Sequence, residues 1–188
     1  MRTRHPRRWT TCLVIATVVG STAGCGGASQ PAAGPAARKP AAEPRRSTDE
    51  ERAAEKAALT AYSGYLTASR EASRSSDPRH PALTRFLADP LLTRVRVAIG
   101  QARTHGAVRI GTLRSDPTVT SVSLGTIPQT VEIQDCLDAT GYRLVYAKDR
   151  RVVPGSGGSR HLATATATRY PDGRWLINSG AAHQDQPC

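Results

Sequence analysis

Residues 89–110 read DPLLTRVRVAIGQARTHGAVRI, and the spacing of apolar side chains changes within this stretch. The first part has one apolar side chain every three or four residues, which predicts a helix with a single apolar face. These side chains are Leu92, Val95, Ile99 and Ala102. Asp89-Pro90 predicts the start of the helix and Gly106 its end. Val108 and Ile110 then alternate with polar residues, which predicts a strand.

Two further helices are predicted before this stretch. Thr48 and Glu51 form a capping box, after which an apolar stripe continues to about Ala72. The stripe contains Ala58, Leu59, Tyr62, Tyr65 and Leu66. Residues 75–78, SSDP, end this helix, and residues 81–88 form a second, shorter one.

Alternating apolar residues continue beyond Gly106 and predict about six strands. The alternating sets lie at 108–110, 122–124, 131–137, 142–146, 162–170 and 173–179. Pro171-Asp172-Gly173 predicts a hairpin turn between the last two. Helices followed by strands indicate a segregated α+β domain over residues 48–188, with helices packed on a mostly antiparallel six-stranded sheet.

The N-terminus resembles a bacterial lipoprotein signal peptide. Residues 1–24 carry four arginines and no acid, then a short apolar run, and end in small residues before Cys25. The resemblance to a lipobox implies that Cys25 becomes the first residue of the mature chain and carries a diacylglyceryl group. An ordinary cleaved signal and a misassigned start are the alternatives. Residues 25–47, rich in Pro and Ala, are expected to act as a tether.

The charge argues against a nucleic-acid partner. The chain has a net charge of +11, which becomes +7 without the four arginines of residues 1–24. The remaining basic residues are scattered and few aromatics accompany them, so no stacking surface is predicted. The expected partner is the membrane, on its extracytoplasmic face and through the lipid anchor, where scattered arginines add modest attraction to anionic lipid.

Two cysteines remain once Cys12 leaves with the signal and Cys25 is lipidated. Outside the cytoplasm, Cys136 and Cys188 are expected to form a disulfide. It would close a loop of about fifty residues and contribute about 3–4 kcal/mol in the chain-entropy model. A Cys–His metal site is disfavoured because the sequence lacks the close ligand pairs of zinc sites. No cofactor is expected.

The predicted order of elements resembles the nuclear transport factor 2-like fold, in which a long helix and two shorter ones cover a strongly bent sheet that closes a cone. Three stretches also resemble small secreted lipoproteins of high-GC actinobacteria. They are Tyr62 with Tyr65, residues 131–138 (VEIQDCLD) and residues 173–177 (GRWLI). The resemblance covers about residues 48–188 and implies a cone-like architecture. It implies little about activity, because most of that family has no assigned one.

No common catalytic motif is present: GxSxG, HExxH, the P-loop and GxGxxG are all missing from the sequence. Enzymes of the cone fold, such as ketosteroid isomerases and polyketide cyclases, place a carboxylate base in an apolar cavity beside tyrosine or acid donors. Asp135 shares strand parity with Val131 and Ile133, so it is the candidate base. Tyr62, Tyr65 and Trp175 are the other candidate cavity residues.

Each candidate also has a structural interpretation. Asp135 lies near the end of its strand and would then reach water, and Tyr62 and Tyr65 would be core aromatics. His161 and His183 are predicted to lie on the surface.

Two functions follow. The first is a non-catalytic domain that binds an apolar small molecule or an envelope protein. The second is a proton-transfer lyase or isomerase. The lack of a second acidic or histidine side chain of matching strand parity favours the first. The oligomeric state is not predicted.

Overall fold

The computed structural model of the chain describes residues 44–188, and their side chains from Thr48 onward. The proposed signal sequence, Cys25 and nearly all of the tether lie outside these residues. Three helices come first: α1 (Pro44–Arg74), α2 (Leu83–Phe86) and α3 (Leu91–Thr104). Six strands follow: β1 (Ala107–Ile110), β2 (Pro117–Ser123), β3 (Thr130–Asp138), β4 (Arg143–Tyr146), β5 (Arg160–Arg169) and β6 (Trp175–His183). The predicted α+β order is confirmed.

The starts of α1 and α3 differ in detail from the prediction, and at α3 the difference is that Pro90 is the N-cap and Leu91 the first helical residue. Helix α1 begins at Pro44, so Thr48 lies inside the helix and is not its N-cap, and the helix includes the last residues assigned to the tether. Proline suits the first turn of a helix, because its missing N–H has no intrahelical partner there. At α3 the Asp89 carboxylate does accept a hydrogen bond from a first-turn amide, that of Thr93, at 3.1 Å.

The strands form two antiparallel sheets, so the prediction of a single six-stranded sheet is wrong. Strands β2, β3, β5 and β6 pair in that order, whereas β1 pairs only with β4. The chain leaves β1 at Gly111, whose φ is +105°. A side chain there would overlap the carbonyl oxygen of Gly141, which precedes β4. This close backbone crossing turns β1 and β4 away from the larger sheet, and only an isolated bridge between Arg114 and Asp138 continues the pairing.

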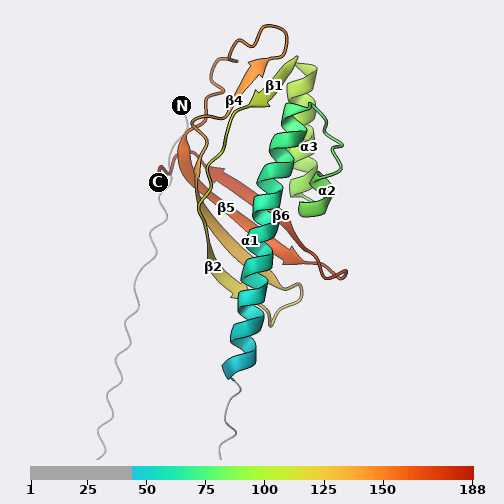
Figure 1. Cartoon of the computed structure of the whole chain (residues 1–188), viewed down its shortest axis with the longest axis vertical. Coiled ribbons are helices and arrows are strands. Elements are labelled where there is room, and N and C mark those ends of the chain that lie inside the picture. The colour runs from blue at the N-terminus through green and yellow to red at the C-terminus, as the bar shows by residue number, and fades with distance from the viewer. Residues whose placement is uncertain (1–43) are drawn as a thin grey trace, which may run out of the picture. The chain divides into compact units, whose positions relative to one another are not determined.

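Helix α1 packs on one face of the larger sheet and contacts all four of its strands (Figure 1). The contact is built from small side chains on both sides. Buried alanines recur along α1 at 54, 58, 61, 68 and 72, and along β5 at 163, 165 and 167. Small residues let a helix and a strand approach closely, so the long helix lies flat on the sheet. Helices α2 and α3 close the core with Leu83, Leu91 and Ile99.

The predicted disulfide between Cys136 and Cys188 is confirmed, with the two Cα atoms 5.8 Å apart. It fastens the C-terminus to β3. The chain end also returns to β5, where the amide of Leu162 donates to the carbonyl of Gln186 at 2.9 Å. Cys136 follows the buried Asp135 and its side chain lies on the other face of β3, where the Arg160 Nε donates to its sulfur.

Candidate functional site

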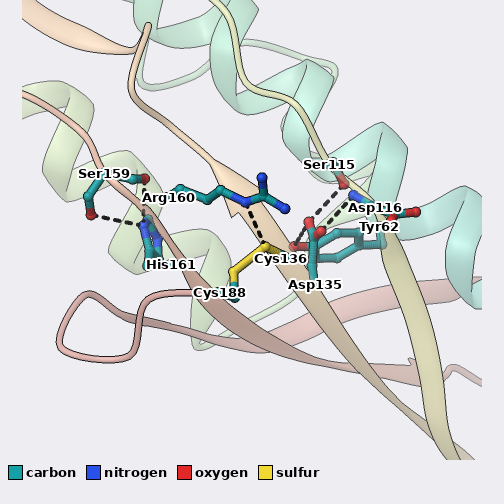
Figure 2. Close-up of a disulfide and its surroundings, with 9 residues drawn as sticks. All are labelled: Tyr62, Ser115, Asp116, Asp135, Cys136, Ser159, Arg160, His161 and Cys188. Atoms are coloured by element: carbon teal, nitrogen blue, oxygen red, sulfur yellow. Dashed lines mark hydrogen bonds between the residues drawn. A yellow bond between two sulfur atoms is a disulfide. The ribbon is translucent and has the colours of Figure 1, made fainter.

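Asp135 is buried on the inner face of β3, as its strand parity predicts. Its side chain is 1% exposed, and it continues the buried set of Val131 and Ile133. The Tyr62 hydroxyl donates to Oδ2 at 2.9 Å, and the Ser115 hydroxyl donates to the same oxygen at 2.8 Å. The backbone amide of Asp116 donates to Oδ1 at 2.7 Å. Figure 2 shows the three donors converging on this carboxylate, beside the disulfide.

This arrangement joins three elements through one side chain. Tyr62 comes from α1, Ser115 and Asp116 precede β2, and Asp135 belongs to β3. Burial, together with the charge and hydrogen bond of Asp135, raises the pKa of Tyr62, so its hydroxyl stays protonated and remains a donor. A buried carboxylate with three donors is a satisfied structural group.

Tyr65, one turn further along α1, belongs to a different environment. Its ring centroid lies 5.9 Å from that of Tyr62, but the ring lines an open cleft instead of the Asp135 cluster. Burial raises its pKa, and the nearby charge of Arg94 opposes the rise. The aromatic stripe predicted from the sequence is therefore divided: Tyr62 is in the core and Tyr65 is in a cleft wall.

Trp175 lies apart from the other three candidates. It lines a shallow pocket of about 480 Å³ against the first half of α1, with Lys56 and Phe86 among its neighbours. Asp135 lines neither this pocket nor the cleft beside Tyr65. The four residues proposed from the sequence thus do not surround one cavity. Tyr62 and Asp135 are in direct contact, Tyr65 adjoins them, and Trp175 is separate.

The cleft beside Tyr65 has a volume of about 880 Å³ and lies between the C-terminal half of α1, α3 and the β1–β4 sheet. Figure 1 shows these elements gathered at one end of the domain. Its walls are mainly aliphatic and aromatic. They include Tyr65, Val95, Ile99, Ala102, Tyr142, Leu144, Tyr146 and Val153. Sequence reasoning missed most of these residues, although the alternation of Tyr142, Leu144 and Tyr146 was visible as a strand signal.

A smaller polar chamber of about 340 Å³ adjoins the cleft and shares Tyr65, Ser69, Arg109 and Tyr142 with it. His161 also lines this chamber. The prediction that His161 lies on the surface is wrong, because β5 parity places it on the inner face with Ala163 and Ala165, and it is 4% exposed. His183, on the neighbouring strand, is part-buried and hydrogen-bonds Thr164 at 3.1 Å.

Positive charge gathers where the cleft meets the chamber. The Arg109 guanidinium lies over the Tyr142 ring, 5.2 Å from its centroid. Burial raises the pKa of Tyr142, whereas the Ser73 hydroxyl and the charges of Arg109 and Arg70 lower it. Among residues 48–188, neither Arg70 nor Arg109 forms an ion pair with a carboxylate. The junction therefore carries two cationic side chains without an internal counter-charge.

Two features are absent from the described part of the chain. No three His, Cys, Asp or Glu side chains there come together in a way that could hold a metal ion. None of the helices there is both long enough and apolar enough to cross a bilayer.

Comparisons with known proteins find likenesses among solved structures. No family model matches the chain, and no curated protein matches it. Among solved structures, the crystal structure of the intermembrane space region of the chloroplast protein ARC6 is similar, with 18% sequence identity and a TM-score of 0.45. The match covers 68% of this chain and 95% of that one. A likeness at this level supports no argument about family or function.

Proposed function

We propose that this protein is a membrane-anchored lipoprotein of the extracytoplasmic face, whose folded domain binds an apolar small molecule without catalysis. The cleft between α1, α3 and the β1–β4 sheet is the observation that carries the binding proposal. Its volume of about 880 Å³ lies in the range of small-molecule sites. Its walls are mostly apolar and include a few polar groups, the composition typical of such sites.

The state of Asp135 supports binding over proton transfer. A general base needs free lone pairs within reach of a substrate. Asp135 is 1% exposed and accepts hydrogen bonds from Tyr62, Ser115 and Asp116. The carboxylate holds the fold together, and the cleft contains no comparable acid in its lining.

The anchor is the second part of the proposal, and it rests on the sequence around Cys25. A diacylglyceryl thioether supplies two acyl chains, which is what stable anchoring requires. The resemblance to secreted actinobacterial lipoproteins of the nuclear transport factor 2-like fold belongs to the same proposal. It is supported by the helix-then-strand order and by the Cys136–Cys188 disulfide.

Mass spectrometry of the N-terminal peptide from the native membrane tests the anchor. We expect a peptide that begins at Cys25 and carries the mass of the lipid, and we expect Cys25→Ser to release the protein from the membrane. An unmodified peptide that reads through Cys25 would contradict the proposal.

The cleft is tested by filling it. Ala98 is an exposed residue of α3 that lines the cleft, so Ala98→Trp places an indole in the mouth of the cleft without disturbing the core. Val97, 51% exposed on the same helix, does not line the cleft and provides the matched control Val97→Trp. In a full-length chain that carries Cys25→Ser, we expect Ala98→Trp to weaken binding of an apolar fluorescent probe by about tenfold, equivalent to about 1.4 kcal/mol. Equal affinity in both tryptophan variants would contradict binding in this cleft.

A further inference from the structure

We infer that the polar chamber beside the cleft binds the anionic head group of an amphiphile, with a phosphate monoester as the preferred head group. This inference rests on the proposed function, because the apolar body of the same ligand would occupy the cleft. The cleft and the chamber share Tyr65, Ser69, Arg109 and Tyr142, so they are adjacent, and one molecule would have to occupy both.

Three residues lining the chamber contain buried polar atoms without a partner. They are the Ser69 hydroxyl oxygen, the Arg70 Nε and the His161 Nε2. A buried polar group that makes no hydrogen bond costs free energy, and folded proteins leave few of them. Here three such residues line one small space. A ligand with several oxygen atoms would offer hydrogen-bond partners to this group of side chains.

The charge of the chamber selects an anion. Arg70 and Arg109 both line it, and neither has an ion-pair partner within the described residues. The acidic residue Glu71 lines a separate small pocket of about 100 Å³ that both arginines also border. Guanidinium groups form strong, charge-assisted hydrogen bonds with carboxylate and phosphate oxygens.

The hydrogen bonding of His161 narrows the choice between these two anions. Its Nδ1 lies 2.9 Å from the backbone carbonyl oxygen of Ser159, which only accepts, so Nδ1 carries a hydrogen and donates. In the neutral ring Nε2 is then an acceptor, and it needs a donor on the ligand. A carboxylate has none, whereas the monoanion of a phosphate monoester keeps one hydroxyl. Its second ionisation lies near pH 6, so this form prevails below that pH. A phosphate head thus presents acceptors to Arg70 and Ser69 and a proton to His161.

The test compares three ligands that share a dodecyl chain: dodecyl phosphate, dodecanoate and dodecanol. Binding is measured by calorimetry with the full-length chain carrying Cys25→Ser, below the concentration at which the ligands form micelles. We expect dodecyl phosphate to bind about tenfold more tightly than dodecanol, with dodecanoate between them, since each charge-assisted hydrogen bond is worth roughly this factor.

Two variants with the same loss of charge locate the effect. Arg70→Gln removes a chamber arginine, whereas Arg103→Gln removes an exposed arginine of α3 that lines neither space. Arg70→Gln should weaken dodecyl phosphate by about tenfold and leave dodecanol within about twofold, and Arg103→Gln should change neither. Arg109→Gln is the second chamber variant, with the same expectation, should Arg70→Gln not fold.

The outcomes separate the two proposals. If dodecanol and dodecyl phosphate bind equally and Arg70→Gln has no effect, the anion subsite is wrong while the apolar cleft stands. If dodecyl phosphate binds and dodecanol does not, the anion subsite is supported and the apolar cleft is wrong. Equal losses of affinity for dodecyl phosphate in Arg70→Gln and Arg103→Gln would show a general charge effect and overturn the anion subsite. Failure of all three ligands to bind would overturn both proposals. Tighter binding of dodecanoate than of dodecyl phosphate would overturn the phosphate preference and support a carboxylate head.

Discussion

Two polar clusters on the inner side of α1 differ in whether their hydrogen bonds are complete. In the first, Asp135 receives donors from Tyr62, Ser115 and Asp116 and is closed to solvent. In the second, Ser69 and Arg70, about two turns further along the helix, and His161 of β5 each keep a buried polar atom without a partner. These residues line a chamber that adjoins the cleft. The comparison teaches that a buried charge is by itself no sign of a functional site; unfilled hydrogen-bonding capacity beside a cavity is the better sign.

The largest expected loss of stability comes from removing Asp135, the centre of the solvent-closed cluster that it forms with Tyr62, Ser115 and Asp116. Asp135→Ala leaves the buried Tyr62 hydroxyl without an acceptor and removes the side-chain hydrogen bonds from Ser115 and Asp116 to β3. We therefore expect the free energy of unfolding to fall by about 3 kcal/mol. Urea denaturation measures the change. Asp116→Ala is the control, because Asp116 contributes its backbone amide and not its side chain. Similar stability losses in the two variants would mean that the Asp135 side chain does not stabilise the fold through these hydrogen bonds.

A smaller loss of stability is expected as the pH rises into the alkaline range. Burial raises the pKa of Tyr62 above the ordinary value of 10.0, and burial also raises those of Tyr65 and Tyr142. The unfolded chain therefore loses these protons first, so the stabilisation is complete below about pH 10 and declines as the pH rises further. Tyr62→Phe should cost about 1.5 kcal/mol at neutral pH through the lost hydrogen bond.

Tyr62→Phe should also make the free energy of unfolding fall less steeply above about pH 10, because it removes one of the three tyrosines with a raised pKa. Unfolding free energies measured by circular dichroism at several pH values above 10, together with tyrosinate absorbance, give the comparison. An equally steep decline in Tyr62→Phe and in the parent chain would mean that Tyr62 does not contribute to it.

The smallest change in stability is predicted for the second cluster, which contains Ser69, Arg70 and His161. One serine from each cluster allows a direct comparison. Ser115→Ala removes a hydroxyl that donates to Asp135 and should cost about 1.5 kcal/mol. Ser69→Ala removes a hydroxyl oxygen with no hydrogen bond, so stability should change by less than about 0.5 kcal/mol. Thermal or urea unfolding of the two variants side by side decides the matter. A loss at Ser69 as large as that at Ser115 would mean that its hydroxyl is already satisfied within the fold.

Much of the candidate site could be predicted in pieces but not as an assembly. The alternation of β3 correctly placed Asp135 on the inner face, and the 3–4 spacing of α1 correctly placed Tyr62 there too. Their contact joins residues 73 positions apart, and no local pattern encodes it. Trp175 was grouped with them on parity alone, yet it lies against the other half of α1. His161 was wrongly predicted to lie on the surface, because an isolated histidine in an Ala–Thr strand carries no signal of what the inner face packs against.

The sequence alone determined the features that depend on near neighbours. The order of three helices and six strands, the turn at residues 171–173 and the inward parity of Asp135 all follow from periodicity and turn chemistry. The disulfide followed from counting the cysteines, on the expectation that Cys12 leaves with a signal sequence and that Cys25 is lipidated. Only the tertiary structure decided that β1 pairs with β4 and leaves the larger sheet, because that outcome depends on the backbone contact of Gly111 with Gly141, thirty residues away. The cleft exists because of this departure, since its walls come from α1, α3, β1 and β4, whose side chains meet only once the strand partners are chosen.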